Sequence, residues 1–119
     1  MMVGIEPAVL VGIGGALGAL CRHSLATAVD REAIPLGTLT VNVVGSFVLG
    51  LVTLATPSES VALLVGVGVC GAFTTFSSFA VETVRLWESG RPLVAVGNAV
   101  ANLVGALAAV GLAWLVLSL

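Results

Sequence analysis

The sequence predicts an all-α membrane protein with four transmembrane helices, and three observations lead to this fold class. Hydrophobic residues make up 59% of the 119 residues and charged residues only 8%, whereas a soluble domain carries roughly a quarter charged residues. The charged residues cluster between long uncharged stretches. Four apolar stretches have the length of about 20 residues that a helix needs to cross a bilayer. The whole chain, residues 1–119, is therefore expected to form one transmembrane domain in a lipid bilayer.

The four helices are expected to follow one another with short connections. They are predicted over residues 7–29, 36–56, 61–87 and 92–118, with a break in the third near 71–75. Only Arg22 and His23 interrupt the first stretch, and prolines bound the uncharged second stretch on both sides. Between the third and fourth helices, Ser89-Gly90-Arg91-Pro92 predicts a helix stop followed by a restart. The last uncharged stretch, at about 1.5 Å per residue, is longer than the bilayer core and must tilt or project.

The charges predict an orientation and exclude one class of partner. With four spans, both termini and the loop 57–60 share one side, which carries no arginine, whereas Arg31, Arg85 and Arg91 lie on the other. The positive-inside rule places the arginine loops in the cytoplasm and both termini outside the cell. The net charge is −2, with four arginines and no lysine. The sequence therefore lacks the basic patch that is typical of a nucleic-acid-binding protein.

Small residues recur at four-residue intervals in the first and fourth helices. Gly14 and Gly18 form a GxxxG step, and Gly97, Ala101 and Gly105 repeat the spacing. Such faces let helix backbones approach closely in lipid. Packing within one bundle and packing between subunits are equally compatible with this pattern. Because four thin helices can hardly enclose a polar path alone, an oligomer is predicted.

The stretch 71–79 is too polar for its predicted depth in the membrane. It combines Gly71, four hydroxyl side chains and three phenylalanines within nine residues. Polar, irregular backbone at membrane depth occurs only where protein or a water-filled cavity covers it. Gly71 can adopt unusual backbone angles, and Thr74 or Thr75 can cap a new helix. We expect a helix break whose carbonyls can bind a cation and whose amides favour an anion.

Polar residues form a stripe on each of two other helices. Thr38, Asn42 and Ser46 share one face of the second helix, and Asn98 and Asn102 stand one turn apart on the fourth. Membrane asparagines either join helices or line a transport path. The two stripes together with the helix break favour a lined path.

Four further residues near this path each have two possible roles. Phe76 and Phe79 share one face, where they either pack or turn the positive edges of their rings towards an anion. Glu82 is either an exposed helix-end carboxylate or part of a vestibule. Arg22 either snorkels to the interface or has a buried role.

No nucleophile–base pair, metal-ligand cluster or phosphate loop is present in the sequence, so an enzyme is not expected. The alternative transport class is a proton-coupled exporter like the small multidrug transporters. Such a protein needs a carboxylate in mid-membrane, whereas Glu6 lies at the start of the chain and Glu82 near the end of a span.

Three segments of the sequence closely resemble the Fluc fluoride channels, also called the CrcB family. They are GIGGALGALCR at 12–22, GTLTVNVVGSF at 37–47 and GAFTTFSSF at 71–79. Their order and spacing agree with the family across essentially the whole chain, and the TTFS-x-F element is specific. The resemblance implies an antiparallel dimer of four-helix subunits with two pores and passive export of fluoride.

The resemblance also implies roles for individual residues. The carbonyls of Gly71 and Thr74 would hold a structural sodium ion at the dimer centre, and Arg22 matches the arginine of the first helix. Fluoride would pass Phe76, Phe79 and Asn42. The rest of the predicted path consists of Thr75, Ser77, Glu82, Asn98 and Asn102, with Thr38 and Ser46 from the stripe on the second helix.

Two departures from the family pattern concern the far end of the path and the partner. Ala106 stands where the family often has serine. Family members that work as homodimers insert in both orientations and need little charge bias, whereas the arginines here are one-sided. The expected partner in the cell membrane is therefore a separately encoded, oppositely oriented homologue, with dual topology and self-pairing as the alternative.

Overall fold

The computed structural model describes residues 4–31 and 33–119, and in these residues it is helical throughout with no strand. Its elements are α1 (Pro7–Val29), α2 (Leu36–Leu54), α3 (Glu59–Val61), η1 (Ala62–Cys70), α4 (Gly71–Phe73), α5 (Ser77–Glu88) and α6 (Pro92–Ser118). Four stretches are long and apolar enough to cross a membrane: Pro7–Val29, Leu36–Leu54, Glu59–Glu88 and Pro92–Ser118. The predicted four-helix class with an interrupted third span is confirmed.

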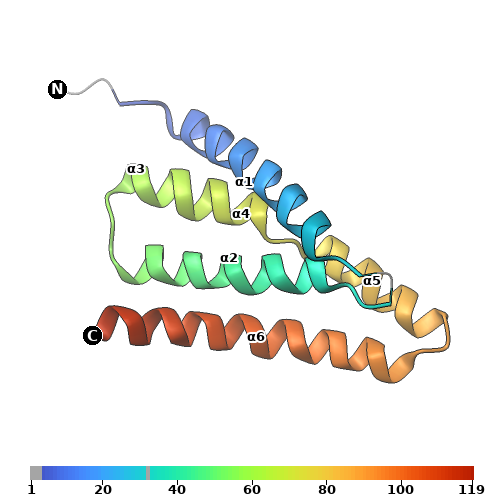
Figure 1. Ribbon diagram of the computed structural model, residues 1–119. Coiled ribbons are helices and arrows are strands. Elements are labelled where there is room, and N and C mark those ends of the chain that lie inside the picture. The colour runs from blue at the N-terminus through green and yellow to red at the C-terminus, as the bar shows by residue number, and fades with distance from the viewer. Residues whose placement is uncertain (1–3, 32) are drawn as a thin grey trace.

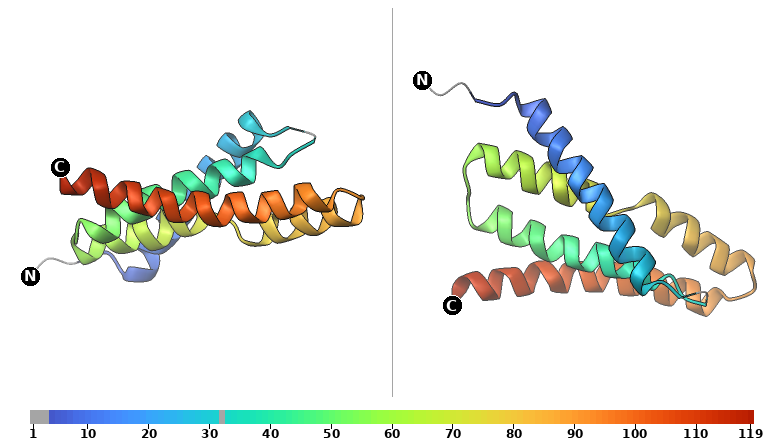
Figure 2. Two further views of the ribbon diagram at one scale, coloured as in Figure 1. Left: turned by 90° about the horizontal axis from the view of Figure 1, so that it is seen from below. Right: turned by 45° about the horizontal axis from the view of Figure 1, so that its top comes forward.

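The four spans run back and forth, so that the start of α1 and the end of α6 lie at one end of the molecule (Figure 1). α2 packs along α6, and α1 crosses η1 and α4 at an angle. The second half of the third span, α5, leaves the line of the first half and packs against the start of α6 (Figure 2). The first half of the third span therefore packs against α1 and α2, and its second half packs against α6.

The glycine step of the first helix packs against another helix of the same chain. A Cβ at Gly14 would overlap the Leu64 carbonyl oxygen, and one at Gly18 would overlap that of Val69. Gly68 on η1 contacts Gly14 in turn, since a Cβ added at Gly68 would lie 2.8 Å from the Gly14 Cα. Of the two alternatives left by the sequence, the structure shows packing inside one bundle for this step.

Three helix ends follow from local chemistry. α2 ends at Leu54, two residues earlier than expected, and Thr56 adopts a φ of 48° that does not continue a helix. The third span begins at Glu59, where the Ser58 hydroxyl accepts a hydrogen bond from the Val61 amide at 3.3 Å. Gly90, with a φ of 81°, ends α5, and the Gly90 and Arg91 amides donate to the Trp87 and Leu86 carbonyls.

The break in the third span differs from the expectation in position and in cause. Gly71 has regular helical angles (φ −61°, ψ −37°), so the prediction that it supplies unusual backbone angles is wrong. The chain leaves the helix at Thr74, whose ψ of 162° is extended, and α5 begins at Ser77. The first half of the span, η1, is also a π-helix, which the sequence pattern did not predict.

Candidate functional site

Asn42 on α2 closes the gap that the break leaves in the backbone hydrogen bonding. Its Oδ1 accepts from the Thr75 amide at 2.8 Å, and its Nδ2 donates to the Thr75 carbonyl at 3.0 Å. The Asn42 side chain thus pairs with both polar groups of one backbone residue, which would otherwise be unsatisfied in the membrane. The Thr75 hydroxyl in turn accepts from the Ser78 amide at 3.2 Å. Of the two threonines predicted to cap the new helix, Thr75 therefore binds its first turn, although the N-cap residue itself is Phe76.

Gly45 on α2, which was not among the residues predicted from the sequence, allows a close contact between α2 and the break. A Cβ at Gly45 would overlap Cγ2 of Thr74 and would lie 3.1 Å from Cδ1 of Phe73. Gly45 stands one turn from Asn42 towards the carboxyl end, where only a residue without a side chain admits Thr74.

The carbonyl groups of Gly71 and Thr74 have no hydrogen-bond donor among the described residues. The Thr75 amide, which would reach Gly71 in a continuous helix, donates to Asn42 instead. The Ser78 amide, which would reach Thr74, donates to the Thr75 hydroxyl. Gly71 is exposed, and a Cβ there would meet nothing within 4 Å. Two carbonyl oxygens suited to a cation therefore lie at the break, one of them on an open surface.

A cavity of about 350 Å³, here called the break cavity, lies beside the break. Phe76 and Phe79 line it, with ring centroids 5.7 Å apart and planes inclined by 54°. Phe76 is 79% exposed in the single chain, which leaves this side of the cavity open. The polar residues in its wall are Asn42, Ser46, Thr74, Thr75 and Asn102.

A second cavity, of about 190 Å³, lies on the arginine side of the break and is called the vestibule cavity. Arg22, Thr38, Thr75 and Glu82 are among its lining residues, and Thr75 also lines the break cavity. The Thr38 hydroxyl donates to Oε1 of Glu82 at 3.0 Å, whereas Oε2 is buried without a partner among the described residues. Thr75 with its Asn42 partner therefore separates two cavities that are both lined by predicted path residues.

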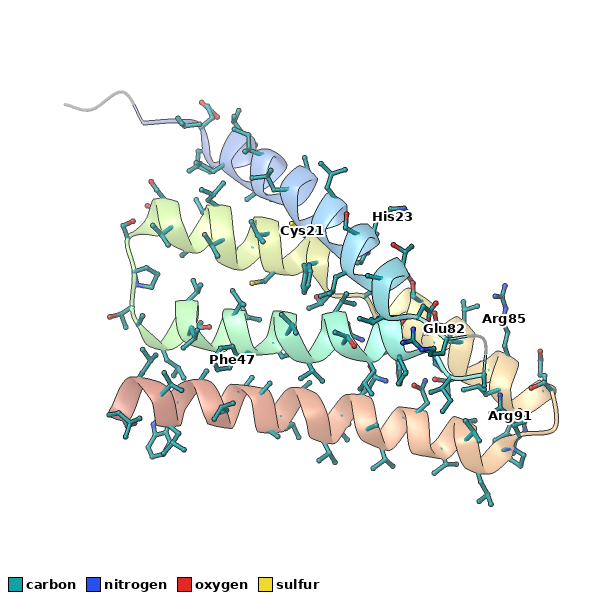
Figure 3. The ribbon with its side chains drawn as sticks, in the orientation of Figure 1. Cys21, His23, Phe47, Glu82, Arg85 and Arg91 are labelled. Carbon is teal, nitrogen blue, oxygen red and sulfur yellow. The ribbon has the colours of Figure 1, made fainter. Side chains whose placement is uncertain are left out.

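Charged side chains gather where α1, α2, α5 and α6 meet, away from the chain ends (Figure 3). Glu82 and Arg85 lie together there on α5, and both line a further cavity of about 260 Å³ with Ser77. Nη1 of Arg91 donates to the Ala33 carbonyl at 2.6 Å and so ties the loop before α6 to the loop before α2.

A continuous row of hydrogen bonds, here called the amide relay, joins three helices. Nδ2 of Asn42 donates to Oδ1 of Asn102 at 3.0 Å. Nδ2 of Asn102 donates to the carbonyl and Oδ1 of Asn98 at 2.9 and 3.2 Å. Nδ2 of Asn98 donates to the Thr83 hydroxyl at 2.9 Å, and that hydroxyl donates to the Phe79 carbonyl at 2.7 Å. Of the predicted path residues, Asn98 is in the relay but lines none of the three cavities described above.

Comparison with known proteins agrees with this arrangement of helices and polar residues. The sequence profile described as CrcB-like protein, Camphor Resistance (CrcB), matches residues 9–114. The chain belongs to the CrcB family. A CrcB-family relative from Haloarcula marismortui, named fluoride-specific ion channel FluC 2, is 66% identical over 113 residues, which cover 95% of both chains. Fluoride-specific ion channel FluC 1 from Halobacterium salinarum is 53% identical over 94% of both.

Two of the similar proteins come from one organism. Methanosarcina acetivorans has relatives named fluoride-specific ion channel FluC 3 and FluC 1, each 44% identical to this chain. They cover 92% and 85% of this chain, and the matches span 100% and 82% of the relatives.

The structure brings most of the residues singled out by the CrcB resemblance to the break or next to it. Thr83 was missed, although it stands one turn after Phe79 on the same helix. The only signal in the sequence was this spacing, which a threonine in any membrane helix could share. Its Asn98 partner is 15 residues away, and no local pattern predicts that pairing.

Proposed function

We propose that this chain is a subunit of a fluoride-selective channel that lets fluoride leave the cytoplasm passively and electrogenically. One observation carries the proposal. In a chain 66% identical to a protein named fluoride-specific ion channel, two phenylalanine rings and two asparagine amides line one cavity at a helix break. The assignment is to a channel and not to an enzyme.

The local electrostatics suit a small anion. α5 begins at the break, and the amino end of a helix carries partial positive charge. The edges of phenylalanine rings are also positive, and a narrow lined passage can replace the ion's water shell. The path proposed for fluoride runs from the vestibule cavity past Arg22, Thr38 and Glu82 to Thr75. It continues through the break cavity along Asn42, Ser46, Phe76, Phe79 and Asn102. Ser77 borders its mouth, and Asn98 supports its wall.

The function is tested by reconstituting the purified protein in liposomes loaded with potassium fluoride. A fluoride electrode should record rapid efflux once valinomycin lets potassium follow, with the same pH on both sides of the membrane. Efflux that appears only with a proton gradient would support the exporter alternative, which the fluoride-channel names of the relatives do not favour. Liposomes without protein give the background leak.

We further propose that the subunit works as an antiparallel dimer in the cell membrane, with two pores. In one subunit the break cavity is open at Phe76, and a second subunit would complete its wall. The one-sided arginines favour one orientation with both termini outside the cell. The partner proposed on this basis is an oppositely oriented homologue, and the occurrence of two relatives in Methanosarcina acetivorans supports this choice over self-pairing.

The Gly71 and Thr74 carbonyls are proposed to hold a structural sodium ion between the subunits. Both oxygens lack hydrogen-bond donors among the described residues, and hard cations prefer such oxygen ligands. A sodium ion held by these residues would offset the partial negative charges of their carbonyl oxygens. Protein purified and assayed with N-methylglucamine in place of sodium should elute as a monomer and lose fluoride efflux. Unchanged elution and efflux without sodium would contradict the proposal.

A further inference from the structure

In the amide relay every hydrogen bond is donated in the same direction, from Asn42 towards Phe79. The groups at both ends of the relay require this direction. At the first end, the Thr75 amide requires the oxygen of the Asn42 side chain, so Nδ2 of Asn42 is left to donate to Asn102. At the other end, the Thr83 hydroxyl accepts from Nδ2 of Asn98 and donates to the Phe79 carbonyl. An asparagine amide can present either its oxygen or its nitrogen to a neighbour. The hydrogen bonds of the relay permit only one orientation of the side-chain amide in each of its three asparagines.

The relay connects residues that line the break cavity with residues that do not. Asn42, Asn102 and Phe79 line the cavity, whereas Asn98 and Thr83 lie outside it. Thr83 instead faces an apolar space of about 270 Å³ beside Trp87 and Val96. Its hydroxyl group still reaches two parts of the cavity wall, the Phe79 backbone directly and the Asn102 amide through Asn98.

We propose that Thr83 is a positioning residue for the fluoride path, and this rests on the function proposed above. Its hydroxyl fixes Asn98, and Asn98 fixes the Asn102 amide with its oxygen towards Asn42. The Asn42 amide then stays paired with Thr75 at the point that separates the two cavities. Without an acceptor at position 83, the buried Nδ2 of Asn98 loses its partner, and the Asn98 and Asn102 amides are free to turn over.

The relay also limits how Asn42 meets an anion. Both hydrogens on its Nδ2 are engaged, one by the Thr75 carbonyl and one by Asn102. Asn42 can therefore donate to fluoride only when one of these two acceptors gives up its hydrogen bond. The orientation of Asn102, held from Thr83, decides how readily that exchange occurs.

The experiment compares Thr83→Val with Thr83→Ser in liposomes that contain on average less than one channel each. Valine keeps the branched shape but removes the hydroxyl, whereas serine keeps the hydroxyl. We expect Thr83→Val to lower the rate constant of fluoride efflux about tenfold, in keeping with one lost buried hydrogen bond. The fraction of vesicles that empty should not change. Thr83→Ser should retain the native rate constant.

Thr40→Val is the matched control. The Thr40 hydroxyl donates to the Leu36 carbonyl at 2.7 Å within its own helix, as Thr83 does to Phe79, but Thr40 is not part of the relay. Its rate constant should stay native. A similar loss in Thr40→Val would show that any helix-bonded threonine has this effect and would overturn the proposal.

The other outcomes separate positioning from stability. A lower fraction of emptying vesicles with a native rate constant would mean that Thr83 serves only the fold. A native rate constant in Thr83→Val, or a slow Thr83→Ser, would also overturn the proposal. If Thr83→Val does not fold, Thr83→Ala replaces it, and failure of both to fold assigns the hydroxyl to the fold. A native protein that passes no fluoride overturns the proposed function as well, whereas native efflux with unaffected variants overturns only the role of Thr83.

Discussion

Asn42 supplies at the break the hydrogen bonds that the backbone of the third span gives up. A membrane offers no water to an unpaired amide or carbonyl, so the break needs such a partner. The Thr75 amide donates to Asn42 and leaves the Gly71 carbonyl available, and the Ser78 amide donates to the Thr75 hydroxyl and leaves the Thr74 carbonyl available. In the function proposed above, the same break serves two ions with different atoms, backbone oxygens for a cation and the cavity beside Phe76 and Phe79 for an anion.

The residue-scale prediction concerns the Phe79 ring. Phe79→Ile should abolish fluoride efflux from liposomes, because isoleucine keeps an apolar side chain at the break cavity but removes the positive ring edge. Phe47→Ile is the control, since Phe47 lies on α2 (Figure 3) and is not part of the cavity wall. Its efflux should remain native. Retained efflux in Phe79→Ile would remove that ring from the mechanism.

At the scale of elements, the close contact between α1 and η1 supports the part of the third span that leads into the break. Gly14 and Gly18 bring the α1 backbone against the Leu64 and Val69 carbonyls. Small residues allow such an approach in lipid, where van der Waals contact replaces the hydrophobic effect. η1 leads directly into α4 and the break, so a displacement of η1 from α1 would move Thr74 relative to Gly45.

The element-scale prediction compares two neighbouring glycines. Gly14→Ala should lower the free energy of unfolding by about 1–3 kcal/mol, the usual cost of an overpacked contact. Gly15→Ala should not, because a Cβ at Gly15 meets nothing within 4 Å. Thermal unfolding in detergent, followed by gel filtration of the heated samples, measures both. Equal midpoints for the two variants would contradict the close contact.

At the scale of the whole molecule, the charges distinguish its two ends. The end that holds Glu82, Arg85 and Arg91 also carries Arg31 in the loop after α1, whereas the end with both termini has no arginine. Because the side of the membrane that carries the arginines tends to stay in the cytoplasm, this asymmetry opposes insertion in both orientations. It supports the proposals made above of a single orientation and of a partner with the opposite one.

The whole-molecule prediction uses engineered cysteines in intact cells, after Cys21 and Cys70 have been replaced by serine. Ser60→Cys, at an exposed position near the loop between α2 and α3, should react with an impermeant maleimide from outside. Glu88→Cys, at the arginine end, should react only after the cells are permeabilised. Each variant serves as the control for the other. Equal labelling of either cysteine from both faces would indicate dual topology and a homodimer.

The sequence alone determined the class of this protein and the stretch in which its third span is interrupted. Span length and apolar composition are local properties, so four spans could be predicted without knowing how the helices meet. The polarity of residues 71–79 likewise marked the break, although the helix was expected to end near Gly71 and continues to Phe73.

Only the tertiary structure decided which atoms satisfy one another. Asn42 pairs with Thr75 across 33 residues of sequence and with Asn102 across 60, and a helical stripe says nothing about the helix it will face. The same holds for Thr83, because its sequence context does not show that α6 places Asn98 beside it. A local pattern gives the face on which a polar group lies, whereas its hydrogen-bond partner depends on how the helices cross.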